Sequence, residues 1–187
     1  MVNDTKQVFD DDIRSSQSAR VPRADVVAAC LEQRVKSILG NVQHAETEPI
    51  QIVKYEVGER YRLHVDWFFT PQNETVKSKN ETRQWNRLAS IFAYLDDDCI
   101  GGETHFPELS PISSTMDSRK FRLEGSGKGL YVKPRKGSAI LWNNLHANGS
   151  GDLRVAHAGL PVSSGRKIGM NIWSKFFLDR QMIGEAH

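Results

Sequence analysis

The stretch Tyr61-Arg62-Leu63-His64-Val65-Asp66 decides how the rest of this sequence is interpreted. Its flanks, Gln51-Ile52-Val53-Lys54-Tyr55 and Trp67-Phe68-Phe69, are rich in β-branched and aromatic residues, which favour strands. On a strand, residues two apart point to the same face. His64 and Asp66 are therefore predicted to project side by side from one rigid element.

The composition is that of an ordinary globular domain. The chain has 187 residues, of which 39% are hydrophobic and 26% charged, so it can bury a sizeable core. A net charge of +2 does not argue for a nucleic-acid or membrane partner. No apolar run reaches the roughly 18 residues of a membrane span. We therefore expect a single domain over residues 1–187, with no nucleic-acid partner and no membrane segment.

Cysteines and asparagines bear on the cellular compartment. Cys30 and Cys99 are too few for a disulfide framework, so we expect free or buried thiols. Asn-x-Ser/Thr sequons occur at Asn3, Asn73, Asn80 and Asn148. Each is a glycosylation acceptor only in a secreted protein, and the first residues lack the pattern of a signal peptide. The sequons favour a secretory route, although the sequence does not assign a compartment.

One helical pattern is followed by many strand-like runs. After Pro22, apolar residues recur at helical spacing until Gly40, which is suited to end a helix. This stripe comprises Val27, Leu31, Val35 and Ile38. Strand-like runs, separated by Gly- and Pro-rich turns, cover residues 50–57, 61–69, 88–95, 129–133, 138–142, 153–157 and 167–177. This order predicts a mainly β fold, a sandwich or barrel with the helix packed outside.

Two polar segments are predicted to lack regular structure. Residues 1–20 are interpreted as an extended lead-in, and residues 70–86 as a mobile loop directly after the His-x-Asp stretch. The loop at 70–86 has two open interpretations, a lid over a site or a solvated insertion without function.

His157 is the candidate for a third metal ligand, 93 residues after His64. Two histidines and one carboxylate form the facial triad of non-haem Fe(II) oxygenases, and only a folded β structure could bring these three together. Lys167 follows ten residues later and opens the apolar run 168–177. An inward-pointing lysine is costly unless it pairs with an anion, which a small dicarboxylate co-substrate would supply.

With these residues in place, the chain resembles the Fe(II)/2-oxoglutarate-dependent dioxygenases, and within them the prolyl 4-hydroxylase catalytic domain. The similarity runs from residue 14 to 176 in five ordered blocks. They are Glu48 to Asp66, Arg87 to Leu95, Gly101 to Pro107, Pro134 to Ala139, and His157 to Trp173. The resemblance implies a double-stranded β-helix, the jelly-roll or cupin-like barrel. It also implies that the family's usual segment ahead of the Arg14-Ser15-Ser16 loop is missing here.

The resemblance implies a role for each matching residue. His64, Asp66 and His157 correspond to the Fe(II) ligands, and Lys167 to the residue that pairs with the distal carboxylate of 2-oxoglutarate. These four are the expected catalytic residues. Tyr55 and Thr104 correspond to hydroxyl donors to the same co-substrate. Residues that correspond to the lining of a groove for a proline-containing peptide are Arg14, Ser16, Glu48, Tyr61, Arg87 and Trp173. O2 is the further co-substrate, with ascorbate as a reductant.

We therefore expect an Fe(II)- and 2-oxoglutarate-dependent hydroxylase of proline in a peptide or protein. Two alternatives stay open: a hydroxylase of a free amino acid or small natural product, and a catalytically silent barrel that binds a partner. Histidines that match no ligand position are His44, His105 and His146. Tryptophans that are interpreted as packing residues are Trp67, Trp85 and Trp142.

Overall fold

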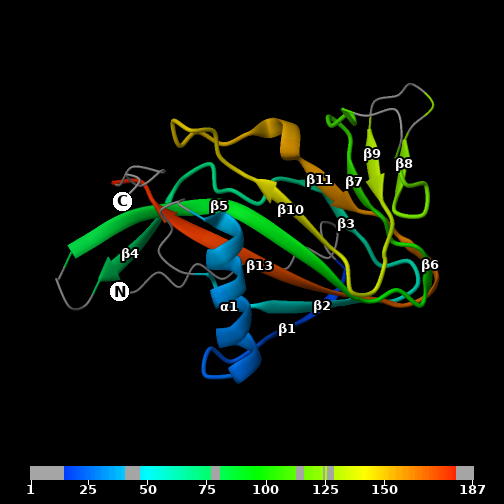
Figure 1. The fold of residues 1–187 in the computed structure, drawn as a ribbon, viewed down its shortest axis with the longest axis horizontal. Coiled ribbons are helices and arrows are strands. Elements are labelled where there is room, and N and C mark those ends of the chain that lie inside the picture. Colours follow the sequence, from blue (N-terminus) through cyan, green and yellow to red (C-terminus); the bar gives the residue numbers. More distant parts are fainter. Residues whose placement is uncertain are drawn as a thin grey trace.

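Within the residues that the structure describes, the fold is built from antiparallel strands, one α-helix and one short 3₁₀ turn (Figure 1). It was obtained as a computed structural model, which describes residues 15–40, 47–76, 81–112, 116–123, 125 and 129–179. The predicted mainly β class with a flanking helix is confirmed.

The larger sheet carries the long strands of the molecule. Its spatial order is β1 (Gln17–Arg20), β2 (Gln51–Tyr55), β13 (Lys167–Phe177), β5 (Glu81–Asp96) and β10 (Ala139–Asn143), with β4 (Gln72–Val76) paired to the start of β5. The 16-residue β5 and the 11-residue β13 run side by side and extend beyond the second sheet (Figure 1). Residues of both strands line the candidate functional site described below.

The second sheet is made of short strands. Its order is β3 (Tyr61–His64), β11 (His157–Gly159), β7 (Thr104–Phe106), β9 (Leu130–Val132) and β8 (Phe121–Leu123). A separate pair joins β12 (Val162–Gly165) to β6 (Cys99–Gly101), and η1 (Leu153–Val155) precedes β11. The two larger sheets form a jelly-roll rather than a closed barrel within the described residues, which confirms the predicted double-stranded β-helix.

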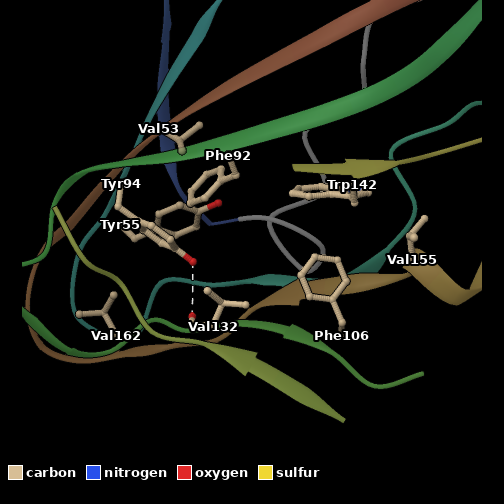
Figure 2. Close-up of a cluster of buried hydrophobic side chains, with 9 residues drawn as sticks. All are labelled: Val53, Tyr55, Phe92, Tyr94, Phe106, Val132, Trp142, Val155 and Val162. Carbon is tan, nitrogen blue, oxygen red and sulfur yellow. Dashed lines mark hydrogen bonds between the residues drawn. The ribbon is translucent and has the colours of Figure 1, made fainter. Parts of the chain in front are cut away.

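The main core lies between the two sheets and is drawn in Figure 2. It is formed by Val53, Tyr55, Phe92, Tyr94, Phe106, Val132, Trp142, Val155 and Val162. These side chains alternate along strands whose other residues face outward, as expected for a half-buried sheet. Several of them also form the walls of the cavity described below.

Helix α1 (Val26–Leu39) covers the outer face of the larger sheet. Asp25 caps its start, because its carboxylate accepts a hydrogen bond from the Val27 amide at 2.8 Å. Gly40 ends it with a positive φ of 60°. The predicted span is therefore confirmed. No described helix has the length and apolar character needed to cross a membrane.

The predicted apolar stripe of the helix is partly wrong. Val27 and Ile38 are 60% and 63% exposed, whereas Ala28 and Val35 are buried against the sheet. The buried face is therefore rotated from the predicted one and includes the small side chain of Ala28, which lies in a cluster with Ile91 and Met170. Apolar periodicity alone did not distinguish these two faces.

Two strand predictions near the site also need correction. The strand predicted over 61–69 ends at His64, so Asp66 lies in the turn that follows. The chain turns there because Trp67 packs inward and its Nε1 donates a hydrogen bond to the carbonyl of Asp152 at 3.2 Å. The strand predicted over 153–157 is instead η1 followed by β11, which begins at His157.

Both segments predicted to be loops contain strands. Residues 17–20 form β1, and the segment 70–86 forms β4 and the start of β5, with residues 77–80 outside the described part. Cross-strand threonines support this polar hairpin, since the hydroxyl oxygens of Thr75 and Thr82 lie 3.5 Å apart. The described part of 70–86 is thus an arm that continues the sheet rather than a loop.

Candidate functional site

Three residues that are distant in sequence meet at the edge of the second sheet. His64 ends β3, Asp66 follows it, and His157 begins β11 directly opposite His64 in the strand register. One possible ligand atom from each lies within 4.8 Å of the other two. Asp66 Oδ1 is 3.7 Å from His64 Nε2, and Asp66 Oδ2 is 3.9 Å from His157 Nε2. The structure therefore brings together the three residues predicted as the triad.

Backbone carbonyls determine which nitrogen of each imidazole faces this cluster. His64 Nδ1 lies 2.7 Å from the carbonyl of Arg62, and His157 Nδ1 lies 3.0 Å from the carbonyl of Val155. A carbonyl oxygen can only accept, so each Nδ1 carries the proton. In the neutral ring, Nε2 is then left with a lone pair directed toward Asp66. Metal-binding histidines in proteins are commonly held in this way.

Asp66 is a buried carboxylate, with a relative exposure of 7%. Burial alone would raise its pKa, but His157, His64 and Arg87 together with a hydrogen bond from Ser90 outweigh this, and the pKa is lowered. An ionised carboxylate and two imidazole nitrogens on one side of an open cavity are the donor set of an Fe(II) facial triad. The residues present therefore fit an Fe(II) ion.

The cavity beside the three residues has a volume of about 30 Å³. Its wall includes Tyr61, which stacks on His64 with ring centroids 3.6 Å apart, and Trp142, whose ring centroid is 4.7 Å from that of His157. Trp142 was predicted to be a packing residue, and it packs in the core while also lining this cavity.

Lys167 lines the same cavity from the start of β13. It is 1% exposed, and its Nζ donates a hydrogen bond to the carbonyl of Gly102 at 2.7 Å. The ammonium also lies 4.3 Å from the ring centroid of Tyr55, its register partner on β2. Burial lowers the pKa of Lys167 to about 8. No carboxylate among the residues that the structure describes forms an ion pair with it, so the cavity offers a cation to an anionic ligand.

The predicted hydroxyl donors Tyr55 and Thr104 both line the cavity. Thr104 is held by Tyr94, since their hydroxyl oxygens are 2.8 Å apart. The Tyr94 hydroxyl also donates to the carbonyl of Val132 at 3.3 Å, the contact drawn as a dashed line in Figure 2. Burial raises the pKa of Tyr94, which keeps it protonated. The sequence prediction missed Tyr94 as the residue that orients Thr104, because it resembles any aromatic core residue of an apolar strand.

A larger groove adjoins the cavity and has a volume of about 490 Å³. Tyr61, Asp66 and Trp173 line both, so the groove and the cavity are direct neighbours. Four of the six predicted groove residues, Glu48, Tyr61, Arg87 and Trp173, are in its lining. Ser16 is not, and Arg14 lies outside the described residues. Arg20 and Lys175 line the groove and were not predicted to do so.

Arg87 connects the groove to the cluster of His64, Asp66 and His157. Its guanidinium binds the carboxylate of Glu48 through two hydrogen bonds of 2.5 and 3.0 Å. It also donates to the backbone carbonyl of Asp66 at 3.1 Å and lies 3.8 Å from the ring centroid of Trp173. Arg87 was predicted only as a groove residue, and here it also anchors the turn that carries Asp66.

The remaining histidines do not join the cluster where the structure describes them. His105 stacks on Tyr131 with centroids 4.0 Å apart, and His146 lies 3.9 Å from the carboxylate of Asp152. His44 falls outside the described residues.

Comparison with known proteins agrees with this geometry. The model of the 2OG-Fe(II) oxygenase superfamily matches residues 50–175. A probable prolyl 4-hydroxylase 4 of Arabidopsis thaliana is 32% identical over 174 residues, covering 91% of this chain and 56% of the relative. The prolyl 4-hydroxylase subunit alpha-2 of Gallus gallus is 34% identical over 150 residues, covering 80% of this chain and 23% of the relative. The chain thus spans about half or less of these curated relatives.

Solved structures support the same fold. The viral collagen prolyl hydroxylase of Paramecium Bursaria Chlorella virus-1, in complex with 2OG, superposes with a TM-score of 0.62 at 25% identity, covering 87% of this chain and 79% of that one. A prolyl hydroxylase of Trichoplax adhaerens, solved with a peptide fragment of hypoxia inducible factor, gives a TM-score of 0.56 at 16% identity, covering 91% of this chain and 66% of that one. The second comparison shows likeness of fold.

Proposed function

Because this chain belongs to the 2OG-Fe(II) oxygenase superfamily, we propose that it hydroxylates proline residues in a peptide or protein. His64, Asp66 and His157 would hold Fe(II), and Lys167 would pair with the distal carboxylate of 2-oxoglutarate. When bound, Fe(II) and 2-oxoglutarate supply the activation of O2 and the insertion of oxygen into a C–H bond. The protein's own residues bind, orient and shield the reactants.

The two ends of the cavity have different proposed roles, in binding the co-substrate and in binding the substrate. At the inner end, the buried Lys167 ammonium offers a charge-assisted contact to an anion, and the hydroxyls of Tyr55 and Thr104 add polar contacts. At the outer end, the aromatic rings of Tyr61 and Trp173 border the opening. These rings would hold an apolar substrate ring close to the metal and reduce the access of water.

The lining that the cavity and the groove share is the observation that carries the peptide proposal. A free amino acid needs only a small enclosed site. The groove instead extends from Trp173 past Phe68 and Trp85 and has polar side chains along it, which suits an extended chain. The similarity to prolyl 4-hydroxylases supports proline as the residue that is modified.

The proposal is tested by substrate-coupled turnover. The purified protein is supplied with Fe(II), ascorbate and 2-oxoglutarate, and succinate is measured with a proline-containing peptide, with free proline and with no substrate. We expect stimulation by the peptide and one added oxygen on its proline by mass spectrometry. Turnover of free proline with inert peptides would instead support the small-molecule alternative, and no succinate under any condition would support the silent barrel.

A matched pair of variants addresses the groove. Trp173→Ala should reduce peptide-coupled succinate formation more than the slow uncoupled reaction, because Trp173 borders the opening between groove and cavity. Phe69→Ala is the control, since Phe69 is 77% exposed and lies outside the groove lining. Equal losses in the two variants would contradict the assignment of the groove to the peptide.

A further inference from the structure

We propose that Ser90 and Asn144 form a positioning pair that orients Asp66, so that one of its carboxylate oxygens is reserved for the metal. The inference rests on the proposed role of Asp66 as a metal ligand. Ser90 lies on β5, and Asn144 directly follows β10, the strand paired to it. Both are almost completely inaccessible, with exposures of 1% and 0%. Neither was predicted from the sequence.

The hydrogen bonds between these residues have only one consistent direction. Ser90 Oγ lies 2.6 Å from Asp66 Oδ2, and an ionised carboxylate can only accept. Ser90 therefore donates its single hydroxyl proton to Asp66. Asn144 Nδ2 lies 2.8 Å from Ser90 Oγ and must be the donor in that second bond. The chain of donors thus runs from Asn144 through Ser90 to Asp66.

The same logic fixes the orientation of the Asn144 amide. If the amide were reversed, its Oδ1 would face Ser90 and compete with Asp66 for the one hydroxyl proton. In the observed orientation, Oδ1 is buried and has no hydrogen-bond partner in the described part of the chain. Such an acceptor is unfavourable. The unpaired Oδ1 is consistent with a role for Asn144 in which its Nδ2, as the donor to Ser90, is the functional atom.

The backbone of Asn144 makes it a rigid anchor. Its amide donates to the carbonyl of Leu88 at 2.8 Å, and its carbonyl accepts from the amide of Asp152 at 2.9 Å. Asn144 is therefore fixed to β5 on one side and to the segment leading into η1 and His157 on the other. Its side chain can transmit this fixed position to Ser90 and then to Asp66.

The consequence concerns the number of positions left open on the metal. A carboxylate can bind a metal through one oxygen or through both. The hydrogen bond from Ser90 withdraws electron density from Oδ2. Oδ1, which lies 3.7 Å from His64 Nε2, is therefore the stronger ligand atom for a metal. With one-oxygen binding, an octahedral ion held by these three residues would keep three positions open, as 2-oxoglutarate and O2 together require. Ser90 and Asn144 are thus positioning residues that preserve the capacity of the site.

A neighbouring serine provides a matched control. Ser174 on β13 is also 1% exposed and also binds β5, because the amide of Ala89 donates to its Oγ at 3.3 Å. It has no contact with Asp66 among the interactions that the structure describes. Ser174→Ala therefore removes a buried hydroxyl of the same strand neighbourhood without changing the proposed pair.

The experiment titrates metal-free protein with Co(II), a stand-in for Fe(II) that has a visible spectrum. Ser90→Ala should weaken Co(II) binding by roughly ten- to a hundredfold and change the intensity of the visible bands, which report coordination number. Ser90→Thr retains the hydroxyl and should restore affinity, and Ser174→Ala should bind as the unmodified protein does. Melting of each metal-free variant, followed by circular dichroism, separates site effects from loss of fold.

Each outcome has one meaning. If the unmodified protein does not bind Co(II), the proposed function fails and this inference fails with it. If it binds, but Ser90→Ala and Ser174→Ala have the same affinity and spectrum, only the positioning pair is wrong. Should Ser90→Ala not fold, Asn144→Ala takes its place, with a several-fold weaker affinity expected. An unchanged affinity in that folded variant would also overturn the inference.

Discussion

The cavity and the groove differ in how their cationic side chains are paired. In the cavity, Lys167 is buried against a backbone carbonyl and an aromatic ring, with no ion-pair partner in the described chain. In the groove, Arg87 is paired with Glu48, and Lys175 is paired with Glu74 at 2.7 Å. The cavity therefore needs an anion to complete it, whereas these two cations of the groove already have carboxylate partners. Single substitutions should have large effects in the cavity and small ones in the groove.

The largest effect is expected from the metal-binding cluster itself. His157→Ala removes one of three donors, so metal affinity should fall by more than about a hundredfold, the upper end of what loss of an outer hydrogen-bond partner costs. Coupled succinate formation should be abolished. Calorimetric titration with Co(II) measures the first effect, and His146→Ala is the control because His146 lies outside the cluster. Near-normal turnover by His157→Ala would refute the triad.

The next effect concerns Lys167. Lys167→Ala removes a charge-assisted contact worth about 1.5–3 kcal/mol, so the Kd for 2-oxoglutarate should rise roughly ten- to a hundredfold while metal affinity changes little. The Kd is measured by titrating the metal-loaded protein. Lys54→Ala on the neighbouring strand is the control, because Lys54 is paired with Glu56. An unchanged Kd in Lys167→Ala would mean that another group holds the co-substrate.

The low pKa of Lys167 predicts a pH dependence with a definite sign. Burial lowers this pKa from 10.5 to about 8, and an anion binds the protonated form. The affinity for 2-oxoglutarate should therefore fall as pH rises above about 8, by at most about tenfold per pH unit. Lys167→Arg stays charged, so its affinity should be flat over the same range. A flat profile for the unmodified protein would contradict the prediction.

The same shift affects the stability of the ligand-free protein. Between about pH 8 and 10.5 the unfolded chain holds the lysine proton and the folded chain does not, so stability should rise with pH across this window. Below about pH 8, Lys167 is charged in the folded and the unfolded chain, so the whole cost of burying its charge lowers the free energy of unfolding. Denaturant unfolding at several pH values, compared with Lys167→Ala, measures this contribution.

The smallest effect is expected at the outer end of the groove. Glu74→Gln removes the ion pair between Glu74 and Lys175 and makes the groove more positive. Since partly exposed ion pairs are worth about 1 kcal/mol or less, the KM for an acidic peptide should fall by at most about fivefold, with the KM for 2-oxoglutarate unchanged. A tenfold or larger change would show that this pair belongs to the reaction centre.

Local patterns predicted the elements that depend on local physics. The end of α1 followed from Gly40, and the long strand β13 followed from its apolar run. The three-residue strands β6 and β7 were missed because their pairings are with strands distant in sequence, and β8 was missed because three residues are too few to show an alternating pattern. Asp66 was assigned to a strand because its neighbours favour one, although packing of Trp67 turns the chain first.

The site was predictable to the extent that its residues carry unusual chemistry. His64, His157 and Lys167 stand out in apolar surroundings, so their chemistry could be inferred. Ser90 and Tyr94 do not stand out, because a serine or tyrosine in an apolar strand resembles ordinary core. The contact of Ser90 with Asp66 depends on the turn after β3 and on the register of β5 with β10, and the contact of Tyr94 with Thr104 depends on the position of β7. These features cannot be predicted from the local sequence.

The direct opposition of His64 and His157 has a consequence for the lifetime of the folded chain. Strands β3 and β11 share only two register pairs, with an irregularity between them. An ion held by both imidazoles would act as a removable cross-link between these weakly joined strands. At a hundredfold excess over its Kd, it would add about 2.7 kcal/mol to the free energy of unfolding. Metal supply would then govern resistance to proteolysis, so a cell short of iron would lose the protein as well as its turnover.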